Sequence, residues 1–71
     1  MRKYLIVIEK ANGNYSAYVP DLPGCVATGD TRDEAEKNIY DAIRLHISGL
    51  LEDRQPVPES AVTSEFLVFD D

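Results

Sequence analysis

The chain has few of the residues and segments that several classes of protein require. Its 71 residues include one cysteine, which excludes an intramolecular disulfide and a metal site built from several thiolates. No stretch approaches the roughly 20 apolar residues of a membrane span, and the short apolar run near the N-terminus is too brief for a signal peptide. We therefore expect a cytoplasmic protein that makes no contact with a membrane.

Basic residues are also scarce. The chain has 7 Lys and Arg residues against 13 Asp and Glu residues, which gives a net charge of −6. An acidic chain repels phosphate backbones, so this charge argues against direct nucleic-acid binding and favours a basic protein partner. The sequence also lacks a glycine-rich phosphate loop and a credible set of metal ligands, so we expect no cofactor.

Residues that would carry catalysis are few and scattered. The carboxylates nearest the ends of predicted strands are Glu9, Asp21 and Asp30. None is predicted in the middle of a strand, so a carboxylate cluster of the metal-dependent nuclease type is not indicated. Cys25 and His46 are the only cysteine and the only histidine of the chain. A catalytic pair is the less simple interpretation, because a cysteine at this place is usually a small buried apolar residue and a histidine on the apolar side of a helix is usually packed and hydrogen-bonded. We therefore predict that the chain is not an enzyme.

The length allows one domain, covering residues 1–71. A domain of this size buries only roughly 60% of the surface that its unfolded chain exposes, so a lone copy would be marginally stable. Association with itself or with a partner would compensate, and the apolar content of 44% supplies material for a contact. We expect a homodimer or a higher homo-oligomer.

The pattern of apolar, turn and capping residues predicts three strands, a helix and a final strand. The strands are expected at residues 3–9, 15–19, 25–28 and 66–69, and the helix at about 32–53. Asn12 and Gly13 tolerate positive φ and predict a hairpin between the first two strands. Thr31 and Glu34 have the spacing of a capping box, in which each side chain satisfies a free backbone donor at the helix start.

This order of elements predicts a two-layer α+β fold of βββαβ type, in which one helix covers one face of a small, mainly antiparallel sheet. Residues 54–61 contain two prolines and form an extended link, after which the last strand would lie parallel to the first through a right-handed crossover. The first and last strands are apolar on both faces. Because one helix covers one face, a second chain is the expected cover of the other.

The surface of the helix and the turn before it leave alternatives open. Small residues recur every seven positions at Ala35, Ala42 and Gly49 and predict a close approach of the helix to the sheet. A second apolar stripe, rotated by roughly a third of a turn, is either core beneath a curved sheet or a subunit interface. The turn at residues 20–24 either only reverses the chain or exposes a feature that a partner recognises. The predicted interface residues are Asp21, Leu22, Tyr40, Ile47, Leu51, Phe66 and Val68.

A combination of turn, cap and link residues extends over nearly the whole chain. It consists of Gly13 and Tyr15, Pro20-Asp21-Leu22-Pro23-Gly24-Cys25, Gly29-Asp30-Thr31, Glu34-Ala35, Asn38, Pro56, Pro58 and Ser60. In these residues the chain resembles the HicB-type antitoxin family of bacterial toxin–antitoxin modules. The resemblance implies a partial ribonuclease-H-like fold and a HicA-type ribonuclease toxin as partner.

Two functions fit these observations. The first is an antitoxin-like protein that neutralises a small basic ribonuclease by binding directly over its active surface. The second is an orphan, homo-oligomeric HicB-like module without a toxin. Many members of the family carry a C-terminal DNA-binding segment, and nothing comparable follows Phe69. We therefore expect no operator binding by this chain.

Overall fold

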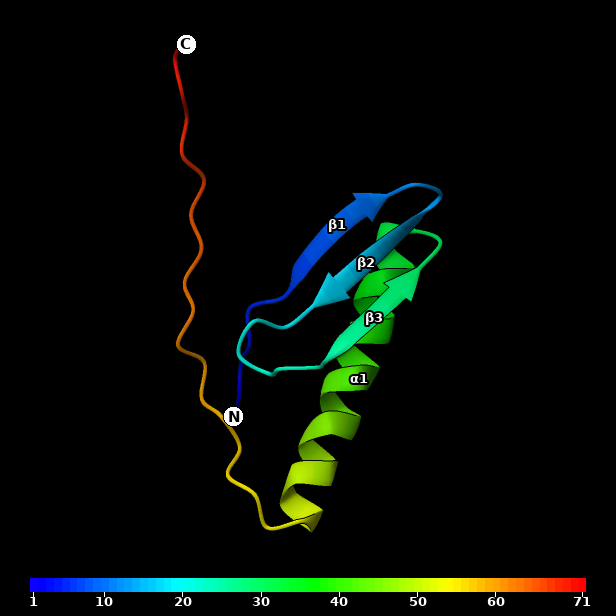
Figure 1. Ribbon diagram of the computed structural model, residues 1–71, viewed down its shortest axis with the longest axis vertical. Coiled ribbons are helices and arrows are strands. Elements are labelled where there is room, and N and C mark those ends of the chain that lie inside the picture. The colour runs from blue at the N-terminus through cyan, green and yellow to red at the C-terminus, as the bar shows by residue number, and fades with distance from the viewer.

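A computed structural model describes residues 1–71 and contains three antiparallel strands packed against one long helix (Figure 1). The elements are β1 (Val7–Ala11), β2 (Asn14–Tyr18), β3 (Val26–Gly29) and α1 (Arg32–Glu52). The sheet has the order β1-β2-β3, and both neighbouring pairs are antiparallel. The predicted sequence of three strands and then a helix is confirmed, although β1 begins four residues later than expected.

Two consecutive turns connect β2 to β3. The Leu22 N–H donates to the Val19 carbonyl over 3.1 Å, and the Cys25 N–H donates to the Leu22 carbonyl over 3.0 Å. Pro23 followed by Gly24, whose φ is +83°, is the pattern of a type II turn. The Val19 N–H closes the loop by donating to the Cys25 carbonyl over 3.2 Å. The predicted turn is therefore present and is rigidly hydrogen-bonded.

The start of α1 is fixed by its capping residues. The Thr31 hydroxyl accepts from the Glu34 N–H over 3.1 Å, as the capping-box spacing predicts. The Glu34 carboxylate accepts from the N–H of Asp30 over 2.9 Å, one residue before the expected donor. Asn38 ties the next turn of the helix to the sheet, since its amide donates to the Thr28 carbonyl over 2.8 Å. These bonds hold the first half of α1 against β3.

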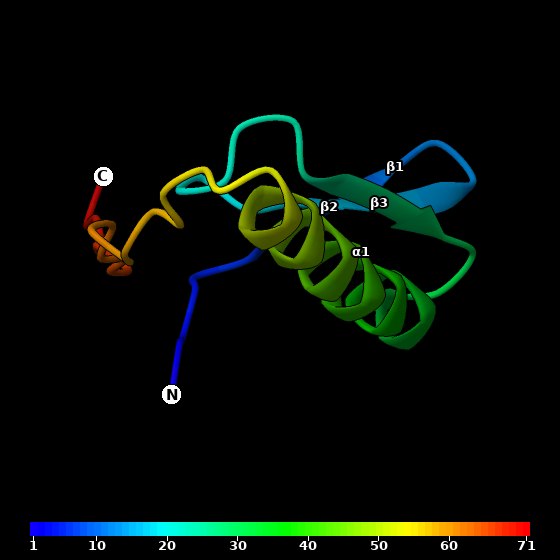
Figure 2. The same cartoon turned by 90° about the horizontal axis from the view of Figure 1, so that it is seen from below.

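The core lies between one face of the sheet and the first half of α1. Figure 2 shows the helix beneath one face, while the other face is open. The buried apolar side chains are those of Ala17, Val19, Leu22, Cys25, Ala35 and Ile39. Gly29 closes the contact, because a Cβ built there would lie 2.4 Å from the Ala35 nitrogen. Gly49 lies in open space, so the predicted close approach holds at Ala35 but is wrong at Gly49.

The expected fourth strand at residues 66–69 does not form. Residues 55–71 have no helix or strand, and the chain runs away from the sheet after its link to the helix (Figure 1). The parallel pairing beside β1 and the ribonuclease-H-like topology are therefore not seen. The fold observed is a small α+β fold of three antiparallel strands followed by one helix.

Candidate partner-binding surface

The structure separates the predicted interface residues into three groups. Two lie in the turn before β3, three lie along the outer side of α1, and two lie in the extended C-terminal segment. In that order they are Asp21 and Leu22; Tyr40, Ile47 and Leu51; and Phe66 and Val68. The fold does not bring the three groups into one site.

The three helical residues form a stripe that the core does not use. We call Tyr40, Ile47 and Leu51 the outer stripe. Tyr40 and Leu51 are 59% and 56% exposed, and Ile47 is half-buried outside the core cluster. Tyr40 follows the buried Ile39 and points to another side of the helix. For Ile47 and Leu51 the cause is one of length, since a helix of 21 residues spans about 32 Å and a strand of 5 residues about 17 Å. The second half of α1 therefore extends beyond the sheet (Figure 1).

A groove lies beside Tyr40, between the N-terminal segment and α1. Its walls are mainly apolar, with one arginine and one glutamate among them: Arg2, Tyr4, Ile6, Glu36, Ile39, Tyr40 and Ile43. The Arg44 guanidinium carbon lies 5.9 Å from the centre of the Tyr40 ring, within reach of a cation–π contact. An apolar depression bordered by a few polar groups is the form of surface that receives a side chain of a protein partner.

The charged residues of α1 are mostly acidic, and Arg44, which lies beside Tyr40, is the basic residue of the helix that pairs with no acid. Arg32 pairs with Glu36 over 2.8 Å and Lys37 pairs with Asp41 over 3.2 Å, so two of the helix's three basic residues are already engaged by acids. These exposed pairs stabilise the helix by only about 0.3–0.5 kcal/mol each. They do not alter the overall charge of −6, which already counts these basic residues.

The turn residues have structural roles that differ from the predicted one. Leu22 is completely buried in the core, so the expectation that it is exposed to a partner is wrong. Asp21 holds the C-terminal segment, because its Oδ2 accepts from the N–H groups of Ala61 and Val62 over 3.1 and 3.3 Å. The sequence carries no signal for a contact across 40 positions, and sequence reasoning missed it.

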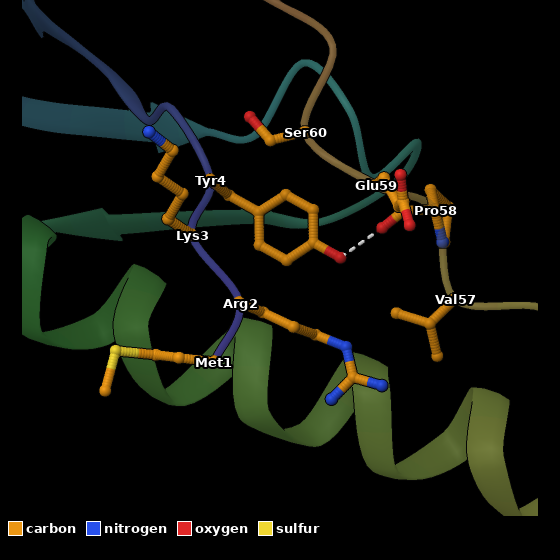
Figure 3. A pocket seen from close by; sticks show the side chains of 8 residues that line it. All are labelled: Met1, Arg2, Lys3, Tyr4, Val57, Pro58, Glu59 and Ser60. Carbon is orange, nitrogen blue, oxygen red and sulfur yellow. Dashed lines mark hydrogen bonds between the residues drawn. The ribbon is translucent and has the colours of Figure 1, made fainter.

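The N-terminal segment supplies a second attachment for the C-terminal segment. Figure 3 shows the Tyr4 side chain pointing toward the link, where its hydroxyl donates to the Pro58 carbonyl. Residues 1–4 and 57–60 together line a shallow cavity there. Beyond Val62 the chain is free of such contacts, and Phe66 and Val68 are 99% and 95% exposed.

The face of the sheet opposite α1 carries an uncovered apolar row. Val7 on β1 is paired with Tyr18 on β2, and Tyr18 is paired with Val26 on β3. Tyr18 and Val26 are exposed and Val7 is half-buried. Because Ile8, Ala17 and Ala27 contribute to the core side, the alternation of a strand places this row on the other side.

Comparison with known proteins identifies the family. The family described as "HicB_like antitoxin of bacterial toxin-antitoxin system" matches residues 4–68. The chain belongs to the HicB-like antitoxin family.

This HicB-like chain is similar to several proteins of related size or greater length. It is 46% identical over 57 residues to a UPF0150 protein of Synechocystis sp., covering 79% of this chain and 72% of the relative. It is 45% identical over 64 residues to an uncharacterized 14.9 kDa protein of Haemophilus phage HP1, covering 90% of this chain. The chain spans 48% of the length of that phage relative.

A solved structure is similar to this HicB-like chain in both fold and sequence. It is the "HicA3 and HicB3 toxin-antitoxin complex", which matches with a TM-score of 0.68 and 34% identity. The match covers 78% of this chain and 64% of the other. The likeness is to the HicB3 antitoxin of that complex.

The HicB-like family is an antitoxin family and is not enzymatic. The Cys25 thiol is buried in the core, and this burial raises its pKa. The nucleophilic thiolate is therefore disfavoured. The structure contains no group of three or more His, Cys, Asp and Glu side chains arranged to hold a metal ion. No helix combines the length and the apolar character needed to cross a membrane.

Proposed function

We propose that this chain is an antitoxin that binds a small basic ribonuclease of the HicA type in the cytoplasm and neutralises it by direct contact. The observation that carries the proposal is its similarity, in fold and sequence, to the HicB3 antitoxin in a complex with the HicA3 toxin. The net charge of −6 supports it independently, because an acidic surface attracts a basic partner.

The proposed mechanism is physical occlusion of the toxin's active surface. The outer stripe and the groove beside Tyr40 offer an apolar centre, and the surrounding acidic residues offer a charged rim. A tyrosine in the middle of such a patch is the type of residue that dominates the free energy of binding. The rim would mainly raise the association rate, so that rate should fall as the salt concentration rises.

Co-expression with a neighbouring small basic ribonuclease tests the function in cells. The ribonuclease alone is expected to stop growth, and this chain is expected to restore it. A folded chain that fails to restore growth would contradict the proposal. That outcome would favour the alternative, an orphan homo-oligomeric module without a toxin.

A pair of matched variants tests the surface. Tyr40→Ala is expected to weaken toxin binding by roughly 30-fold, the effect of losing about 2 kcal/mol at an interface centre. Leu45 is 76% exposed on the same helix but lies away from the outer stripe, so Leu45→Ala should bind as the wild type does. Isothermal titration calorimetry measures both. Equal losses in the two variants would show that the outer stripe is not the contact.

A further inference from the structure

The two edges of the sheet differ in how their backbone groups are satisfied. β1 and β3 are the edge strands of the three-stranded sheet. On β3, the Thr28 carbonyl is occupied by the Asn38 amide over 2.8 Å. β1 pairs with β2 alone, and its other side has no strand next to it. A free edge of this kind is a ready template for another strand.

The C-terminal segment has the composition of a strand but no partner. Residues 66–69 read Phe-Leu-Val-Phe, and they are 99%, 70%, 95% and 79% exposed in that order. Their side chains present apolar surface on the order of several hundred Å², which monomeric proteins rarely leave in contact with water. The family match extends through residue 68, so this segment is within the matched region and is not an unrelated extension.

The segment is attached near the start of its own β1 but does not follow it. Tyr4 holds Pro58, and the Asp21 carboxylate holds the N–H groups of Ala61 and Val62. Beyond Val62 the chain continues in an extended form and stands clear of the sheet of its own molecule (Figure 1). The apolar side chains are thus held away from the free β1 edge of the same chain.

We propose that residues 64–69 of one copy add as a strand to the free edge of β1 in a second copy, and that the exchange is reciprocal. Each chain has one unpaired C-terminal segment and one free β1 edge. In a two-fold symmetric exchange, both segments and both β1 edges are therefore paired. The added strand continues the sheet beside the uncovered row of Val7, Tyr18 and Val26, and supplies apolar neighbours to it. Its apolar side chains suit this face, whereas attraction of a basic toxin depends on the acidic surface.

Cross-linking between two different single-cysteine chains tests the exchange directly. In a Cys25→Ser background, one chain carries Val7→Cys or Glu9→Cys, and the other carries Val68→Cys. After mixing and oxidation, a disulfide-linked heterodimer is expected with at least one of the two β1 positions. Replacing Val68→Cys by Leu45→Cys is the matched control and should give only background cross-linking.

The same cysteines distinguish exchange from closure within one chain. A chain that carries Val68→Cys together with whichever β1 cysteine cross-links in the mixed experiment should form covalent dimers on oxidation. If it forms only a cyclised monomer, or if the mixed chains never cross-link above the control, the proposal is wrong.

Sedimentation gives a second measurement that does not depend on the register. The wild type is expected to sediment as a dimer, and Phe66→Asp with Val68→Asp should raise the dissociation constant by roughly 100-fold or more, since each buried apolar side chain contributes more than a tenfold step. Leu45→Asp is the matched control and should remain dimeric. The helical signal in circular dichroism should be retained in both variants, because the altered side chains lie outside the core of the isolated chain.

Several results would overturn the exchange. They are a strictly monomeric wild type, a double variant that associates as tightly as the wild type, and a segment that gains hydrogen-exchange protection only when toxin is added. The last result would assign the segment to the toxin. None of the self-association measurements requires a toxin, so failure of the exchange is separate from failure of the proposed function.

Discussion

Replacing Gly29 by alanine is expected to destabilise the fold strongly, because the added methyl group has no room. A Cβ at this position would lie 2.4 Å from the Ala35 nitrogen, 2.8 Å from the Glu34 carbonyl carbon and 2.9 Å from the Ala35 Cα. All three are backbone atoms, so no side chain can rotate away. The start of α1 would have to move outward from β3.

The size of the effect follows from what that movement disturbs. Overpacking of a core contact costs about 1–3 kcal/mol, and displacement of the Thr31 cap adds about 1 kcal/mol. We therefore expect a loss of about 2–4 kcal/mol. A 71-residue domain has a free energy of unfolding of about 4–11 kcal/mol at the usual stability per residue. The variant should therefore lose a large fraction of its stability and unfold at a clearly lower urea concentration than the wild type.

Urea unfolding followed by circular dichroism measures this loss, and Gly49→Ala provides the matched control. Gly29 lies in β3 and packs on α1, whereas Gly49 lies within α1 and has nothing within 4 Å of an added Cβ. Replacing Gly49 by alanine should therefore stabilise the chain by about 0.5–1 kcal/mol, because alanine has the higher helix propensity. If Gly29→Ala unfolds at the same urea concentration as the wild type, the close packing of β3 on α1 is wrong.

Three further perturbations test the loop, the thiol and the C-terminal attachment. Leu22→Ala should lower the free energy of unfolding by about 2–5 kcal/mol although it lies in a turn, because its side chain is buried; a near-neutral result in urea unfolding would contradict the core assignment. Burial raises the pKa of the Cys25 thiol, so the folded chain keeps a proton that the unfolded chain releases in alkaline solution. Stability from this group is therefore complete at neutral pH and falls as the pH rises past the ordinary thiol pKa; urea unfolding should show a larger alkaline loss for the wild type than for Cys25→Ser, and equal losses would count against it. Asp21→Ala should accelerate hydrogen exchange at the Ala61 and Val62 amides, whereas unchanged rates would show that the carboxylate does not hold them.

The elements that the sequence predicts well are those whose causes are local. The start of α1 depends on Thr31 and Glu34, which are three residues apart and bond to nearby backbone groups. The turn before β3 depends on Pro23 and Gly24, whose backbone preferences select a type II turn. In both places the neighbouring residues contain the information that fixes the structure.

The features that the sequence did not predict depend on distant contacts. Leu22 lies in a turn that folds back onto the core, and no local pattern states which side of a turn becomes buried. The strand expected at residues 66–69 has suitable residues, but a strand forms only where a free edge meets it. Periodicity predicts the outer stripe on α1, whereas the exposure of its second half, at Ile47 and Leu51, follows from the difference in length between the helix and the sheet.

Titration of a purified ribonuclease with this chain tests the central claim most directly. The partner to be tested is a small basic ribonuclease of the HicA type, and the readout is cleavage of a labelled RNA. The account predicts that cleavage falls in proportion to the chain added and stops when the concentration of the chain is about equal to that of the ribonuclease. The Tyr40→Ala variant should need a higher concentration to stop cleavage. Undiminished cleavage at a large excess of folded chain would contradict the account.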